Sequence, residues 1–227
     1  MGHSRALAPA RAPSADALTA DMVGMGMLVG GEGSHDPNIE DTLLFASFEG
    51  MEHGDLRVLA VLATWFGVHS GRVNADRLTR LVGLQGSTRV RAFWGALARW
   101  RAADRRFARL VQTYRGPRVD LLPTGTEFQV ARHGEDPRFA GSKLRAPANV
   151  LRDRPSDVLS PTELGKRHAA YRWRLVIGPT YRADMWAALE RDHGLPAAAL
   201  ARRTYGSFAT AWQVRRDFAT WKAARGA

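Results

Sequence analysis

The C-terminal part of the chain constrains the fold more than any other stretch. Between residues 177 and 221, apolar side chains recur at helical spacing in three short segments, and Gly206 lies in the corner before the last one. Ser207 follows, and a serine at such a point caps the first turn of a helix. Two helices around a short glycine-bearing turn are typical of a helix-turn-helix. We therefore predict a helix-turn-helix domain of three helices over residues 177–227.

The outer face of the last predicted helix suits base recognition. The residues at helical spacing that are expected to pack inward, turning polar side chains outward, are Phe208, Ala211, Val214, Phe218 and Trp221. In a helix-turn-helix this outward face lies in the major groove, where glutamine binds adenine and arginine binds guanine. An ordinary three-helix bundle has the same periodicity and remains the alternative. The candidate DNA contacts are Thr210, Gln213 and Arg216 for bases, and Arg203 and Ser207 for phosphates.

A second module is predicted over residues 37–140, with its elements in the order of a winged helix. Helical periodicity predicts helices over residues 38–53, 56–71, 75–84 and 88–106. The predicted caps of the last three are Asp55, Asn74, and Ser87 or Thr88. Alternating residues then predict a small β-wing, with strands over residues 107–114, 119–122 and 127–131. A plain α+β domain is the alternative. The candidate nucleic-acid contacts are Arg89, Arg91 and Arg99 on the last helix, and Arg115 and Arg118 at the wing tip.

The remaining segments are predicted to be less regular. Residues 1–36 are rich in Ala, Gly and Pro without a sustained period, so a flexible N-terminal tail is expected, with a short helix over 14–27 as the alternative. Prolines interrupt residues 132–160. Ser160, Pro161 and Glu163 then form a helix start signal. We expect one rigid connector helix from there to Gly178, so that residues 141–176 are a linker and connector.

The charge of the chain favours a polyanionic partner. The net charge is +11 at pH 7, and phosphate contacts dominate the affinity of proteins for nucleic acids. Nearly all basic residues are arginines, which is typical of GC-rich coding, so some of them are simply solvated surface. The chain has no cysteine and no apolar run long enough for a membrane helix, and we do not expect its N-terminal residues to be a signal peptide. We expect a cytoplasmic protein without membrane contact.

Motifs for catalysis are scarce. His133 lies beside Glu135 and Asp136, but the spacing of a metal site is missing, and Asp136 is expected to form an ion pair with Arg138. The glycine-rich residues 24–33 lack the preceding strand of a nucleotide-binding loop. The sequence therefore predicts no enzyme, no cofactor and no metal site.

The C-terminal segment resembles the compact helix-turn-helix of bacterial regulators encoded beside nucleotidyltransferase genes. Phe218 replaces the final leucine of that group's pattern. The supposed pairing with an N-terminal winged helix is similar to the AbiEi-like antitoxins of abortive-infection systems. The resemblance implies autorepression and neutralisation of a nucleotidyltransferase toxin. The matching residues are Gly178, Arg182, Ala183, Asp184, Leu200, Ala201, Arg202, Ser207, Arg216 and Asp217.

These observations predict a mainly α-helical, sequence-specific repressor that binds double-stranded DNA. A toxin partner is what the resemblance implies. A homodimer is compatible with the sequence, although two modules on one chain can also cover two half-sites. The alternative function is a protein–protein adaptor without sequence-specific DNA binding. An apolar outer face on either predicted recognition helix would favour the adaptor, and Phe208 and Trp212 are the candidates for such exposure.

Overall fold

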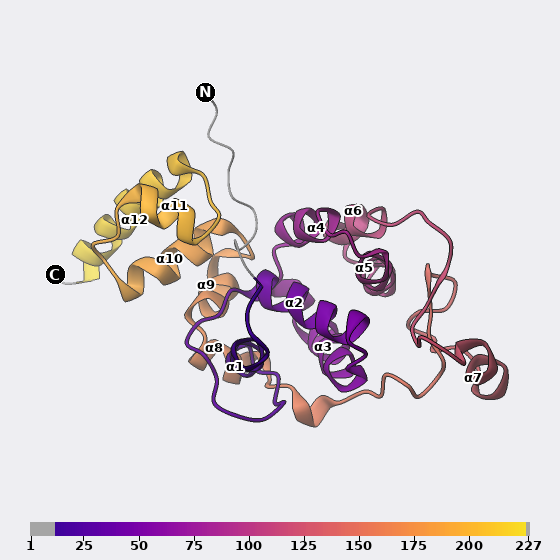
Figure 1. Cartoon of the computed structure of the whole chain (residues 1–227). Helices are drawn as coiled ribbons and strands as arrows, with labels where there is room; N and C mark the ends of the chain where they lie inside the picture. The colour runs from indigo at the N-terminus through magenta and orange to yellow at the C-terminus, as the bar shows by residue number, and fades with distance from the viewer. Residues whose placement is uncertain (1–11, 226–227) are drawn as a thin grey trace.

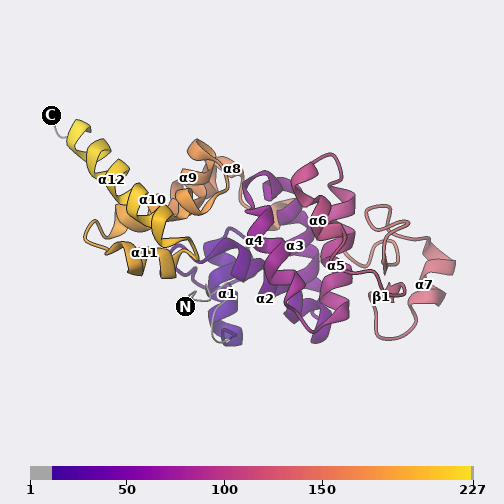
Figure 2. The ribbon, with the colours of Figure 1, turned by 90° about the horizontal axis from the view of Figure 1, so that it is seen from above.

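The computed structural model describes residues 12–225, and in this range the chain is mainly helical (Figure 1). Its helices surround two separate hydrophobic cores. The larger, N-terminal core contains side chains of α1 to α6, and the smaller core belongs to α10, α11 and α12. The molecule is elongated, with the C-terminal helices at one end and β1 and α7 at the other (Figure 2).

The N-terminal body is a cluster of short helices, most of which begin at a side-chain cap. Trp65 and Trp94 lie at its centre, and Phe66 packs edge-to-face on Trp94. The predicted caps Asp55, Asn74 and Ser87 are confirmed, since each accepts a hydrogen bond from the backbone N–H three residues on. The elements are α1 (Ala15–Gly24), α2 (Ile39–Glu52), α3 (Leu56–His69), η1 (Ser70–Arg72), α4 (Ala75–Gly83), α5 (Thr88–Trp100), η2 (Arg105–Phe107) and α6 (Ala108–Val111).

The predicted flexible tail is wrong for residues 15–27, which pack against the N-terminal body; the alternative of a short helix over residues 14–27 is confirmed by α1. Met22, Met25 and Met27 are fully buried there. The indole N–H of Trp65 donates to the Met25 carbonyl at 2.8 Å. Methionine fills irregular gaps in a core, which is why this segment is ordered in spite of its glycine-rich composition. Residues 1–11 of the predicted tail lie outside the described residues.

The predicted β-wing is also wrong, because its outer two segments are helical. Residues 107–114 contain the end of η2 and α6, and residues 127–131 lie in α7 (Thr126–His133). Phe107, Leu110 and Tyr114 are buried, and their spacing is that of a helix and not of a strand. The only strands in residues 12–225 are β1 (Val119–Asp120) and β2 (Leu144–Arg145), which pair in parallel. A winged-helix arrangement is therefore not confirmed.

The predicted connector helix is broken into two. α8 (Pro161–Arg167) follows η3 (Pro155–Asp157) and begins with the predicted capping box of Ser160 and Glu163. It ends at His168, whose extended backbone starts α9 (Ala169–Ile177). The buried His168 ring lies 3.0 Å from the Pro37 carbonyl. This contact with a distant segment fixes the break.

The predicted three-helix C-terminal body is present. It consists of α10 (Tyr181–Arg191), α11 (Ala197–Arg203) and α12 (Phe208–Arg225) around a core that includes Met185, Leu200 and Val214. Residues 204–207 form the corner between α11 and α12. Ser207 caps α12, since its Oγ accepts from the Thr210 N–H at 3.0 Å. A side chain at Gly206 would collide with Met185, so the corner packs directly onto α10.

Gly50 permits the close contact of α2 with α3, and its replacement by alanine is expected to destabilise the protein. An added Cβ would collide with the Leu59 side chain and lie 3.1 Å from the Asp55 carbonyl oxygen. Overpacking of this kind costs about 1–3 kcal/mol. At Gly83, the last residue of α4, an added Cβ meets no atom within 4 Å, so Gly83→Ala is expected to be neutral or slightly stabilising. Chemical denaturation followed by tryptophan fluorescence measures both; equal effects would contradict the packing argument.

Candidate functional site

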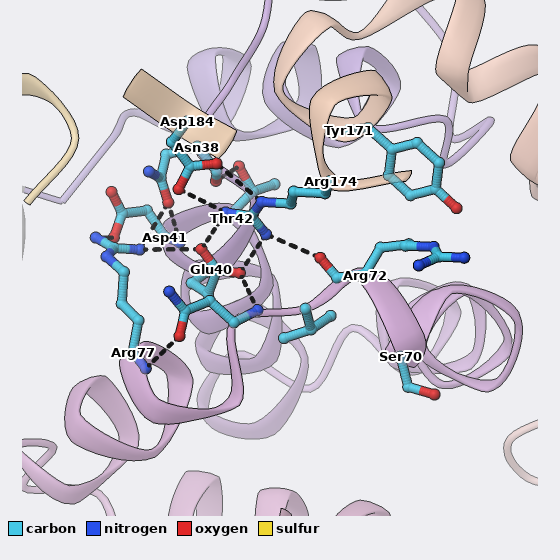
Figure 3. Close-up of polar contacts among 12 residues, drawn as sticks. Asn38, Glu40, Asp41, Thr42, Ser70, Arg72, Arg77, Tyr171, Arg174 and Asp184 are labelled. Atoms are coloured by element: carbon cyan, nitrogen blue, oxygen red, sulfur yellow. Dashed lines mark hydrogen bonds and ion pairs between the residues drawn. The ribbon is translucent and has the colours of Figure 1, made fainter. Parts of the chain in front are cut away.

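A buried ion-pair network joins the two bodies of the molecule. Arg174 of α9 lies between Glu40 of α2 and Asp184 of α10, and it binds each carboxylate through two hydrogen bonds (Figure 3). The shortest of these contacts, from Nη1 of Arg174 to Oε1 of Glu40, measures 2.6 Å. Arg77 of α4 extends the network by binding Asp41 at 2.5 Å. The four helices α2, α4, α9 and α10 are therefore held together by opposite charges.

The network is shielded from water, which shifts the pKa values of its carboxyl groups. Burial raises the pKa of Asp41 and that of Asp184 above their usual values. Burial also opposes the charge of Glu40, but Arg174 and Arg77 outweigh it and hold the pKa of Glu40 below its usual value. Glu40 and Arg174 are at most 1 % exposed. We infer that the network fixes the orientation of the C-terminal helices, since little of it reaches the surface.

The outer face of α12 is an exposed surface of the C-terminal body. As predicted, Ala211, Val214 and Phe218 are buried against α10 and α11. The inward prediction is wrong for Phe208, which is 60 % exposed, whereas Trp221 is partly buried against the core. Trp212 is 51 % exposed. The guanidinium of Arg216 stacks over the Trp212 ring, 4.9 Å from its centroid. The exposed face therefore combines aromatic, amide and cationic side chains, and it lies at one end of the molecule (Figure 2).

The five side chains predicted to contact DNA from the C-terminal body differ in their exposure. Arg203, Gln213 and Arg216 are exposed, and the last two lie three residues apart on α12. Ser207 and Thr210 are half-buried, and their hydroxyls are 2.7 Å apart within the helix cap. The cap therefore already uses two of the five side chains that were predicted to contact DNA.

The predicted contacts on α5 do not form one outward basic face, which corrects the prediction for Arg89. The Arg89 guanidinium donates to the carbonyls of Met51, Asp120 and Leu121 at 2.9–3.1 Å. It therefore joins α2, α5 and the end of β1. Arg91 is half-buried as well. A periodicity argument missed these positions because the partners of Arg89 are distant in sequence.

Arg118 also has a structural role, whereas the side chains of Arg99 and Arg115 form no ion pair with any residue from 12 to 225. Arg118 forms an ion pair with Glu135 and donates to the Leu144 carbonyl. Arg99 and Arg115 are exposed and line one cavity, together with Lys143. The sequence assigned Arg99 to a recognition helix and Arg115 to a wing tip, and no pattern indicated Lys143.

The loop that follows α7 has the predicted ion pair. Arg138 binds Asp136 at 2.7 Å and also donates to the Leu151 carbonyl. His133 is exposed at the end of α7. Between residues 12 and 225, no group of three or more histidine and acidic side chains is arranged to hold a metal ion.

Comparison with protein-family models, with curated proteins and with solved structures finds no match to this chain. The structure itself defines a mainly helical protein with two hydrophobic cores and a minimal two-stranded sheet. Within the described residues, no helix is both long enough and apolar enough to cross a membrane. The functional argument therefore depends on the exposed surfaces.

Proposed function

We propose that the protein is a DNA-binding repressor that places the outer face of α12 in the major groove of double-stranded DNA. The observation that carries the proposal is the combination of Gln213 and Arg216 on a free helix face that follows a short capped corner. Glutamine and arginine are the side chains that bind adenine and guanine edges through paired hydrogen bonds. Arg203, on the preceding helix, supplies a phosphate contact.

The charge and rigidity of the C-terminal body support the same proposal. α12 carries Arg215, Arg216, Lys222 and Arg225 against the single acidic residue Asp217, which pairs with Arg182 at 2.8 Å. Such a surface attracts the DNA backbone. The buried ion-pair network holds α10 on the N-terminal body, so that α12 is presented on a preorganised support.

Replacing Gln213 by alanine is expected to relax the preference for one base position in the cognate DNA, by about 1–3 kcal/mol of discrimination. Arg203→Ala is expected to weaken the binding of all sequences alike. Fluorescence anisotropy with the DNA upstream of the protein's own gene and with a random duplex measures both effects at fixed salt concentration. Exposed Arg57, on α3, provides the control Arg57→Ala, for which no change is expected. Weak and equal binding of both duplexes by the unmodified protein would refute the proposal.

A second candidate function is supported by the exposure of Phe208 and Trp212. Aromatic side chains are enriched at the centres of protein–protein interfaces, so this surface also suits an adaptor that binds another protein. The nucleotidyltransferase toxin implied by the resemblance is one such partner, and co-purification with the product of the neighbouring gene tests it. Loss of that complex in a Phe208→Ala/Trp212→Ala variant, with DNA binding absent, would favour the adaptor.

A further inference from the structure

A cavity of about 320 Å³ lies between α5, the end of α6 and the loop before β2. This part of the molecule is remote from α12 in both views (Figures 1 and 2). Two glycines are among its lining residues. Gly95 leaves the α5 wall without a side chain, and a Cβ at Gly141 would lie 3.7 Å from Nη2 of Arg99. The volume is at the lower end of the range for small-molecule sites.

Three cationic residues line this cavity. Arg99 comes from α5, Arg115 from the turn after α6, and Lys143 from the loop before β2. Gln112 adds an amide, and none of the described residues that line the cavity is acidic. Like charges around one cavity repel each other, whereas an anion between them is attracted by all three.

These three cations differ from their neighbours, because no group within the described part of the chain neutralises them. Arg118, Arg138 and Arg145 lie in the same part of the chain, and each forms an ion pair with an aspartate or glutamate. Between residues 12 and 225, the side chains of Arg99, Arg115 and Lys143 form neither an ion pair nor a hydrogen bond. Their charges are therefore available to a ligand.

We propose that this cavity binds a small phosphorylated ligand, with Arg99, Arg115 and Lys143 as the groups that bind its phosphate oxygens. Arginine pairs with phosphate through two parallel N–H···O bonds, and lysine adds a point charge. Three cations suit a ligand with more than one phosphate charge. The site is distinct from the α12 surface and does not depend on the proposed DNA-binding function.

The test is a calorimetric titration with inorganic pyrophosphate, at an ionic strength held constant with sodium chloride. We expect saturable binding to the unmodified protein, and a loss of affinity of about tenfold or more in both Arg99→Gln and Lys143→Gln. Arg57→Gln removes an exposed arginine elsewhere and is expected to bind as the unmodified protein does. The two cavity variants are expected to keep the melting temperature of the unmodified protein, because their side chains make no polar contacts that folding would lose.

Three outcomes would overturn the proposal. One is the absence of saturable pyrophosphate binding, and another is equal affinity in all four proteins, which would indicate attraction by net charge alone. The third concerns DNA. If Arg99→Gln weakens the binding of a random duplex and leaves pyrophosphate binding unchanged, the cavity contacts backbone phosphates and not a small ligand.

Discussion

Replacing Arg174 by methionine is expected to lower the free energy of unfolding by about 3–5 kcal/mol, the cost of leaving a buried charge without its partner. The substitution removes the guanidinium between Glu40 and Asp184, so the two buried carboxylates lose four hydrogen bonds. It also removes the contact between α9 and the Arg72 carbonyl, at 3.0 Å. Chemical denaturation followed by tryptophan fluorescence measures the change.

The matched control is Arg172→Met, on the same helix. Arg172 binds Glu190 at 2.6 Å, but its side chain is 43 % exposed. An exposed ion pair contributes no more than about 1 kcal/mol, since water and salt screen it. A similar loss of stability in both variants would contradict the assignment of the buried network as the connection between the two bodies. Two separate unfolding transitions in Arg174→Met alone would support it.

Acidification is expected to destabilise the protein by about 4 kcal/mol between pH 7.5 and pH 5 through two buried histidines. Burial lowers the pKa of His69 and that of His168 to about 4, from the usual histidine pKa of 6.5. The folded protein therefore binds fewer protons than the unfolded chain between these values. Their stabilising contribution is complete above pH 6.5 and is lost as the pH falls towards 4. Each histidine accounts for about 2 kcal/mol.

Both histidines act as neutral rings with fixed hydrogen-bonding roles. Since a carbonyl only accepts, Nε2–H of His69 donates to Leu159 at 3.0 Å, and its Nδ1 accepts from the Tyr171 hydroxyl at 2.7 Å. In the same way Nε2–H of His168 donates to Pro37, and its Nδ1 accepts from the Tyr171 backbone N–H. A proton on either Nδ1 would remove an acceptor that the fold uses.

Denaturation of His69→Gln and His168→Gln at both pH values tests this prediction. Each variant is expected to lose about 2 kcal/mol less than the unmodified protein over this range, whereas His133→Gln, at an exposed position, is expected to behave as the unmodified protein does. The variants are compared with the unmodified protein because other charged groups also change its stability with pH. Asp36 favours the charged form of His168, while Arg174 and Arg191 oppose it. The raised pKa values of Asp41 and Asp184 also stabilise the folded state as the pH falls. An unchanged pH dependence in both variants would refute the assignment.

Sequence reasoning succeeded where the determining contacts are local. The caps at Asp55, Asn74 and Ser207 involve an N–H three residues away, so a residue type at a given spacing predicts them. The buried face of α12 follows from the helical period in the same way. The exposure of Gln213 and Arg216 is the complement of that face. Residues within each of these elements are therefore sufficient to predict it.

Where sequence reasoning failed, contacts between distant segments determined the structure. Arg89 was predicted to point outward, but three carbonyls that are 31 to 38 residues away hold it. Residues 107–114 alternate as a strand does, and yet the space beside α4 and α5 favours a helix that buries Phe107 and Leu110. Local propensity is weak when a core accepts only one arrangement.

By itself, the sequence determined the helical character of this protein, the positions of most helix starts and the face that α12 buries, because hydrogen bonds and periodicities within one helix specify them. Only the tertiary structure decided which arginines are free. Arg174 and Arg89 are enclosed by partners that are distant in sequence. Arg99, Arg115 and Lys143 instead line one cavity, and within residues 12–225 no acidic side chain pairs with them. The physical reason is that the energy of a charge depends on its solvation and on the charges around it, and folding sets both.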